Sequence, residues 1–207
     1  MKRLLLFTGL LALLASPRPA SAAPIIGAQL IATGGPVIAQ FMGHTAGFTN
    51  ELYVFDISDL TTPLAVTGTA GTLGQGMIFN NQTSVVGTQV NLGAFAAGTE
   101  LVFGIYVQNT GMTYYMGPAA RNPDGIAHAA IDNGLLPQFP PYGVIPAGFV
   151  GVGFEDIFLG GDFDYDDLGF AFNNVRTRAA VPEPVTLSLL ALGLAGLGAR
   201  RMRQRRD

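Results

Sequence analysis

Turn-forming residues interrupt the middle of this chain about every ten positions, and this spacing restricts its fold more than any other feature. Between residues 24 and 180 no apolar pattern keeps the 3.6-residue period of an α-helix over any length, while Gly, Thr, Val, Phe and Tyr are abundant. Such a pattern indicates short strands joined by turns. The sequence therefore predicts a single all-β domain, with a jelly-roll-like β-sandwich as the leading architecture.

The expected strands are the apolar segments 25–32, 51–57, 75–79, 85–92, 101–107, 112–116, 126–131, 149–154 and 168–175. In one of them, the odd-numbered positions are all apolar and fall on one face by the two-residue period of a strand: Leu101, Phe103, Ile105 and Val107. Gly104 and Tyr106 fall on the opposite face. We therefore expect this strand to lay one face against a core.

The first 22 residues have the composition of a secretion signal. Lys2 and Arg3 precede the apolar run 4–15, and Ala20-Ser21-Ala22 supplies the small residues that signal peptidase accepts. A buried N-terminal helix is the alternative, but two prolines follow the apolar run and would end it. We expect signal peptidase to act after residue 22 and residues 23–180 to form the exported domain.

Residues 181–207 consist of three successive parts. Pro182 and Pro184 keep the backbone around Glu183 extended. An apolar stretch, 185–199, would be about 22 Å long as a helix, a marginal transmembrane span. The chain then has a cytoplasmic stop signal of five arginines: Arg200, Arg201, Arg203, Arg205 and Arg206. A short transmembrane helix with the domain outside is expected, and a permanent anchor or an amphipathic surface helix are the alternatives.

This three-part tail resembles the PEP-CTERM sorting signal of Gram-negative bacteria that make exopolysaccharide. The resemblance implies recognition at Pro182, Glu183 and Pro184 by a membrane-embedded exosortase. It further implies transient tethering in the inner membrane, removal of the span and the arginines, and release or attachment at the cell surface or in the extracellular matrix. A role in exopolysaccharide or biofilm is the functional expectation that follows.

The net charge of residues 23–180 limits the kinds of partner that this segment can bind. Residues 23–180 contain three arginines and twelve carboxylates, a net charge of −9. This part of the chain therefore repels nucleic acid and anionic lipid, so no nucleic-acid partner is expected, and cations are favoured. The chain has no cysteine, which excludes disulfides and thiolate ligands.

Half of these carboxylates lie in one short segment: Glu155, Asp156, Asp162, Asp164, Asp166 and Asp167. Two carboxylates 4 Å apart repel by about 4 kcal/mol at an effective dielectric constant of about 20, so a loop that brings several together needs a cation or bound protons. Oxygen-only ligands suit calcium, and we expect these six residues to form a Ca²⁺ site. The turn Gly and the bidentate Glu of an EF-hand are missing. A solvated acidic turn, with Phe163 and Tyr165 packed inward, is the alternative.

Residues 99–175 also resemble the domain of unknown function 4114. The resemblance rests on residues 98–103 (Gly-Thr-Glu-Leu-Val-Phe), 122–125 (Asn-Pro-Asp-Gly) with His128, and 153–156 with 162–167. Asp166 stands where the family tends to have Asn, and Phe163 is apolar at a variable position. No established activity comes with this resemblance.

The sequence favours a non-enzymatic surface or matrix protein. One alternative is a carbohydrate-active hydrolase that uses Glu155 and a loop Asp as paired carboxylates, and another is a metal-free adhesin module. His44 and His128 have no partner at metal-ligand spacing, so both are expected to be structural or surface residues. No serine stands in a Gly-x-Ser-x-Gly turn, which argues against a hydrolase triad.

Overall fold

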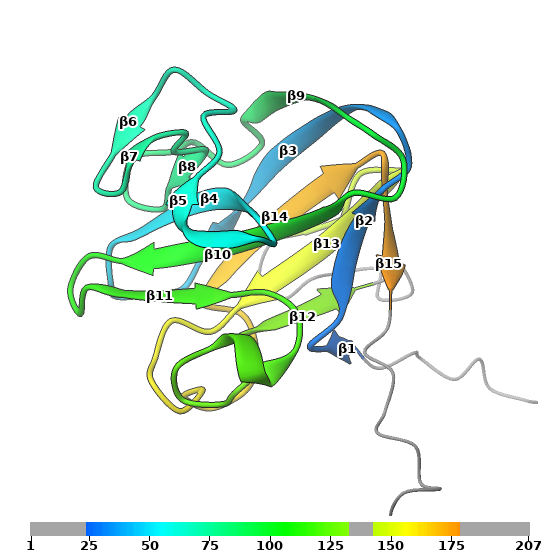
Figure 1. The fold of residues 1–207 in the computed structure, drawn as a ribbon. Coiled ribbons are helices and arrows are strands. Elements are labelled where there is room, and N and C mark those ends of the chain that lie inside the picture. Colours follow the sequence, from blue (N-terminus) through cyan, green and yellow to red (C-terminus); the bar gives the residue numbers. More distant parts are fainter. Residues whose placement is uncertain (1–23, 133–142, 179–207) are drawn as a thin grey trace, which may run out of the picture.

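The structure is a computed structural model that describes residues 24–132 and 143–178 (Figure 1). These residues form two main antiparallel sheets stacked as a sandwich, which confirms the all-β prediction. One short 3-10 helix, η1 (Ala119–Arg121), lies in a loop. Within the described ranges, no helix has the length and apolar character needed to span a membrane. The expected secretion signal and sorting tail lie outside the described residues.

The first sheet has six strands. Their order across the sheet is β1 (Ile25–Ile26), β12 (Ala129–Asp132), β13 (Phe149–Phe154), β14 (Leu168–Asn173), β3 (Gly35–His44) and β9 (Gln89–Phe95). All of these neighbours pair antiparallel.

The second sheet lies against the first. Its main path is β15 (Val175–Arg178), β2 (Gln29–Ala32), β10 (Glu100–Val107), β4 (Asn50–Asp56) and β5 (Asp59–Pro63). Two further strands extend it, β11 (Met112–Tyr115) beside β10 and β8 (Phe79–Asn80) beside β4. A separate ribbon pairs β6 (Ala70–Gly71) with β7 (Gly74–Gln75).

The larger hydrophobic core lies between the two sheets. The four odd-numbered residues predicted for the inner face of β10 are all buried in it, which confirms the two-residue alternation. Phe103 of β10 stacks on Phe172 of β14 with 3.9 Å between ring centroids. Because these strands belong to different sheets, this aromatic pair joins the two layers directly.

The outer face of the second sheet is covered as well, which the sequence did not predict. Tyr53, Phe55 and Val102 form a second buried cluster on this face. Gly104 permits it, because a Cβ at that position would lie 2.9 Å from Tyr115 Cδ1 and 3.0 Å from Phe55 Cε2. The loop-rich segment between β5 and β8 supplies the cover through side chains such as Met77.

Two segments expected as single strands each divide between the sheets. Residues 25–32 break at Gly27, whose φ is 69°, so that β1 joins the first sheet and β2 the second. Residues 168–175 break at Asn174, whose φ is 51°, and β14 and β15 separate in the same way. Gly and Asn are the residues that adopt this left-handed conformation most readily, and both breaks let the chain cross between layers.

Other strand predictions were wrong in part. Strand β3, ten residues long, was missed because it begins at Gly35-Pro36, although Val37, Ala39 and Phe41 alternate into the core. Strand β5 was also missed. Segment 75–79 divides into β7 and β8, segment 85–92 becomes a strand only from residue 89, and segment 126–131 only from residue 129.

Candidate functional site

The acidic segment 155–167 is the loop that joins the neighbouring strands β13 and β14, and it packs beside the loop that contains η1 (Figure 1). All six carboxylates expected as metal ligands lie in it. The structure does not bring all six to one point but separates them into three groups.

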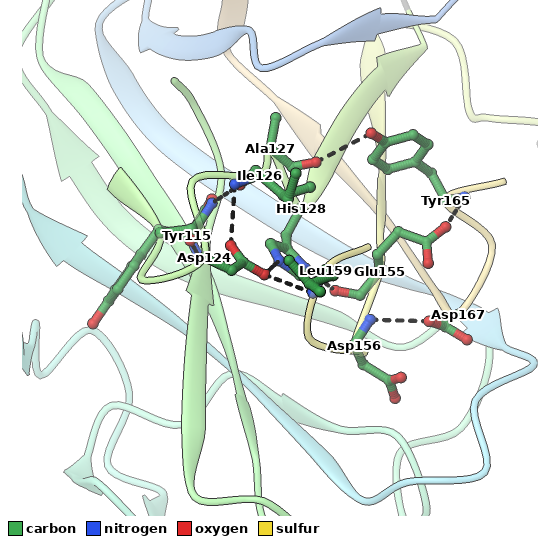
Figure 2. Close-up of polar contacts among 11 residues, drawn as sticks. Tyr115, Asp124, Ile126, Ala127, His128, Glu155, Asp156, Leu159, Tyr165 and Asp167 are labelled. Atoms are coloured by element: carbon green, nitrogen blue, oxygen red, sulfur yellow. Dashed lines mark hydrogen bonds and ion pairs between the residues drawn. The ribbon is translucent and has the colours of Figure 1, made fainter. Parts of the chain in front are cut away.

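The first group is a cluster of Glu155, Asp162 and Asp164. One carboxylate oxygen from each lies within 4.8 Å of the other two. Glu155 is 1% exposed, whereas both aspartates are exposed at the surface of the loop. The backbone N–H of Tyr165 donates to Glu155 Oε1 at 2.6 Å, which holds the glutamate beneath the turn (Figure 2). Three of the six predicted ligands therefore converge.

This cluster concentrates negative charge in a partly desolvated place. Burial raises the pKa of Glu155 to about 7, the Tyr165 N–H opposes the rise, and the charges of Asp167, Asp164 and Asp162 add to it. A carboxylate that is buried beside other carboxylates is stabilised either by a proton or by a cation. The arrangement can therefore bind a hard cation through oxygen atoms.

The loop reaches this shape through an unusual backbone. Three residues other than glycine have positive φ: Leu159 at 68°, Phe163 at 63° and Tyr165 at 57°. Gly160 and Gly161 also have positive φ, and a Cβ at Gly161 would lie 2.9 Å from Glu155 Oε2. A side chain at Gly161 would displace the Glu155 carboxylate, and glycine readily adopts the positive φ that both positions have.

The two aromatic residues of the loop differ. Tyr165 is buried, and its hydroxyl donates to Ala127 O at 3.1 Å. Phe163 is 51% exposed, so the inward packing of both rings that the solvated-turn alternative included was wrong for Phe163. Alternation along this segment fails because its residues are in left-handed turns and not in a strand.

The second group is Asp156 with Asp167. The N–H of Asp156 donates to Asp167 Oδ2 at 2.9 Å, and Asn50 Nδ2 donates to Asp156 Oδ2 at 2.7 Å. Burial raises the pKa of Asp167 to about 6, the bond from the Asp156 N–H opposes this, and the charge of Asp156 adds to the rise. These carboxyls line a pocket on the side of the loop that faces residues 47–50.

The remaining predicted ligand, Asp166, contacts Thr45 in the segment that follows β3. Thr45 Oγ1 lies 2.9 Å from Asp166 Oδ1 and 2.8 Å from Asp166 O, within hydrogen-bond distance of both. The N–H groups of Thr45 and Ala46 donate to the carbonyl of Asp167. These contacts attach the end of the acidic loop to the chain that follows β3.

His128 joins the acidic loop to its neighbour. It is fully buried, and its ring stacks on Tyr114 with 3.8 Å between centroids. Its Nε2 lies 2.8 Å from Asp124 Oδ2 and its Nδ1 lies 2.9 Å from the carbonyl oxygen of Glu155 (Figure 2). The two contacts hold the ring between Asp124 and the first residue of the acidic loop.

Asp124 completes this link. Its Oδ2 also accepts the N–H of Leu159, and its Oδ1 accepts the N–H of Ile126. Burial alone would raise the pKa of Asp124, but the bonds from His128, Leu159 and Ile126 outweigh it and hold the pKa below its usual value. Sequence reasoning expected His128 to be a structural or surface residue but did not pair it with Asp124, and the only signal for the pair was its place in one short run, residues 122–128.

Comparison with known families assigns the C-terminal tail. Residues 180–204 match the PEP-CTERM protein-sorting motif. No curated protein and no solved structure matches the chain. The resemblance of residues 99–175 to the domain of unknown function 4114 stays a prediction.

The matched segment contains the expected recognition residues, Pro182, Glu183 and Pro184, and the first three arginines of the stop signal. These residues lie outside the part of the chain that the structure describes. The PEP-CTERM motif marks proteins that are exported, held at the membrane and processed by an exosortase before display. The chain is therefore an exosortase-sorted surface protein.

Proposed function

We propose that this surface protein is a non-enzymatic component of the cell surface or extracellular matrix whose acidic loop binds calcium. The observation that carries the proposal is the convergence of Glu155, Asp162 and Asp164 within 4.8 Å. In this proposal signal peptidase removes residues 1–22 and the inner membrane holds the chain only transiently. The host is a Gram-negative bacterium, and the final setting is its exopolysaccharide.

The donor set supports calcium over the softer metals. Calcium takes six to eight oxygen ligands, and loop carbonyls and water would complete the carboxylates of Glu155, Asp162 and Asp164. The chain lacks cysteine, and both ring nitrogens of the nearby His128 contact acceptors. A bound cation would offset the mutual repulsion of the carboxylates and hold the loop in one conformation.

The exposure of the cluster supports a bridging role. Glu155 lies below the loop, while Asp162 and Asp164 are open to solvent. A cation held by these three residues would keep coordination positions on its outer side. Carboxylates or hydroxyls of an exopolysaccharide could occupy these positions and attach the domain to the matrix.

The same geometry supports binding over glycoside hydrolysis. A hydrolase needs both carboxyls at a sugar, yet Glu155 is 1% exposed and the chain at Gly161 closes over it. The hydrolase alternative would gain support if the chain turned over exopolysaccharide and Glu155→Gln abolished that turnover. A metal-free adhesin module is the reading that remains if calcium has no effect.

Thermal unfolding of the full chain in phosphatidylcholine nanodiscs, followed by circular dichroism, tests the proposal. Extracellular calcium modules have dissociation constants of about 10⁻⁴–10⁻³ M, so about 10 mM calcium should add about 1.4–2.7 kcal/mol to the free energy of unfolding. For a domain of this size the melting temperature should rise by about 3–10 °C relative to EGTA.

The matched control separates the site from general charge loss. Asp162→Asn with Asp164→Asn should abolish the rise, because both exposed ligands lose their charge. Asp56→Asn with Asp59→Asn removes the same charge at the exposed turn between β4 and β5 and should leave the rise unchanged. Identical melting curves in calcium and EGTA for the unaltered chain would refute calcium binding.

A further inference from the structure

A pocket of about 310 Å³ lies beside the calcium cluster and is separate from it. It is lined by Gly47, Phe48, Asp156, Ile157 and Asp167. Its volume is at the lower limit of small-molecule sites, about 300–1,000 Å³, so it suits a small group or a single side chain. None of the three clustered calcium ligands is among its lining residues.

The lining combines apolar walls with two carboxyl groups. Phe48 packs partly against the main core and Ile157 is 47% exposed, so both present carbon surface. Asp156 is 2% exposed and accepts a hydrogen bond from Asn50. The ion pairs that join described residues are Arg121 with Glu100 and His128 with Asp124, and neither neutralises this carboxyl pair.

Asn50 lies behind the pocket lining and is not itself one of the lining residues. The Asn50 Nδ2 group donates to Phe48 O at 3.3 Å and to Asp156 Oδ2 at 2.7 Å, so the amide group lies between two residues of the pocket lining. Both contacts require the nitrogen at this position, which sets the orientation of the amide. Its Oδ1 is buried and has no hydrogen-bond partner among the described residues. Buried polar atoms are seldom left in this state without a ligand or water.

We propose that this pocket binds a primary ammonium group carried on an apolar stem, such as a lysine side chain or a free aliphatic amine. The ammonium has three N–H donors and a positive charge, which match the carboxyls of Asp156 and Asp167. The methylene stem can pack against the apolar surface that Ile157 and Phe48 contribute to the lining. The inference does not rest on calcium binding, because the two sites use different carboxylates.

The apolar walls distinguish an organic cation from a metal ion. Calcium requires six to eight oxygen atoms, whereas this pocket offers two carboxyls among carbon surfaces. A guanidinium is flat and prefers a bidentate carboxylate, whereas a small pocket of about 310 Å³ with carboxyls from two separate residues suits one compact ammonium charge. The net charge of −9 for residues 23–180 adds a long-range attraction for cations of either kind.

The test follows the δ1-methyl resonance of Ile157 in the full chain, in phosphatidylcholine nanodiscs with EGTA at neutral pH. The probes are n-butylamine and the peptide acetyl-Gly-Lys-Gly-amide, and their neutral controls are butan-1-ol and the norleucine peptide. Both amines should shift the resonance saturably and the controls should not. A shift with only the peptide assigns the ligand to protein lysines, and a shift with only butylamine assigns it to free amines.

Variants identify the carboxyls responsible. Asp156→Asn and Asp167→Asn should each lower amine affinity about tenfold or more, because each removes a charge-assisted hydrogen bond. Asp162→Asn with Asp164→Asn should leave amine affinity unchanged while it abolishes the calcium effect. The methyl resonances of Ile31 and Ile105, both buried in the core, report whether each variant is folded.

Three outcomes overturn the proposal. The first is the absence of a saturable shift with either amine. The second is equal binding of butan-1-ol, which would make the pocket merely apolar. The third is a shift of Ile157 in a separate titration, with calcium in place of EGTA, that Asp156→Asn abolishes, since it would assign the pocket to a metal ion. Failure of the calcium proposal alone would leave the amine titration unaffected.

Discussion

Replacement of His128 by phenylalanine should destabilise the protein more than any exposed substitution in the acidic loop. Phenylalanine keeps the ring that stacks on Tyr114, but it removes both hydrogen bonds. The side chain of Asp124 is fully buried and loses its contact with the His128 ring. Removal of one partner from a buried ion pair costs about 3–5 kcal/mol, and the lost bond to the Glu155 carbonyl adds about 1 kcal/mol.

Two remaining donors reduce this loss. The N–H groups of Leu159 and Ile126 still donate to Asp124, so we expect a total near the lower limit, about 3–4 kcal/mol. Typical domains have a free energy of unfolding of about 5–15 kcal/mol, which makes such a loss a large share of it. The acidic loop should be affected first, because His128 and Asp124 hold it at Glu155 and Leu159.

Urea denaturation of the full chain at neutral pH, followed by circular dichroism, measures this loss. His44→Phe is the matched control, since it removes the other histidine, whose Nδ1 lies 3.2 Å from the Ala46 carbonyl at a half-buried position. The control should cost less than about 1 kcal/mol. A loss below about 1 kcal/mol for His128→Phe would refute the view that this pair fastens the loop.

Two further predictions concern pH and the loop backbone. The folded pKa of Asp124 lies below its unfolded value of about 3.9, so its contribution to stability is present above about pH 4 and is lost as the pH falls through the folded pKa. The difference in unfolding free energy between the unaltered chain and Asp124→Asn, measured by urea denaturation, should therefore shrink in acid. A difference that stays constant with pH would contradict this. Gly160→Ala should weaken calcium binding, because φ at this position is 80° and the new Cβ would collide with the Phe163 ring. Titration calorimetry measures the affinity. An unchanged affinity would show that the loop tolerates another backbone conformation.

The predictions that held were those that depend on residues close together in the chain. The alternation of apolar residues along residues 101–107 indicated the buried face of β10 because side chains of a strand alternate by covalent geometry alone. The sorting tail was recognised for a similar reason, since its three parts follow one another directly and residues 180–204 match the motif. The acidic loop was visible as a local run of carboxylates between two apolar segments.

Several of the predictions that failed needed information about distant residues. A φ of 51° at Asn174 sends β15 to the other sheet, and this depends on the strands available on each side. The covered outer face of the second sheet needs Met77, far from Val102 in sequence, to pack across it. A pattern of residues along the sequence contains no information about contacts between distant parts of the chain.

The sequence by itself determined the class of fold, the C-terminal sorting tail and the position of the acidic loop, because periodicity, composition and order along the chain are local properties. Only the tertiary structure decided which carboxylates meet. Glu155 and Asp156 are adjacent in sequence, yet Glu155 joins Asp162 and Asp164 while Asp156 contacts Asn50 and lines a different pocket. The physical reason is that neighbouring residues point in different directions, and their partners come from elements that folding alone brings together.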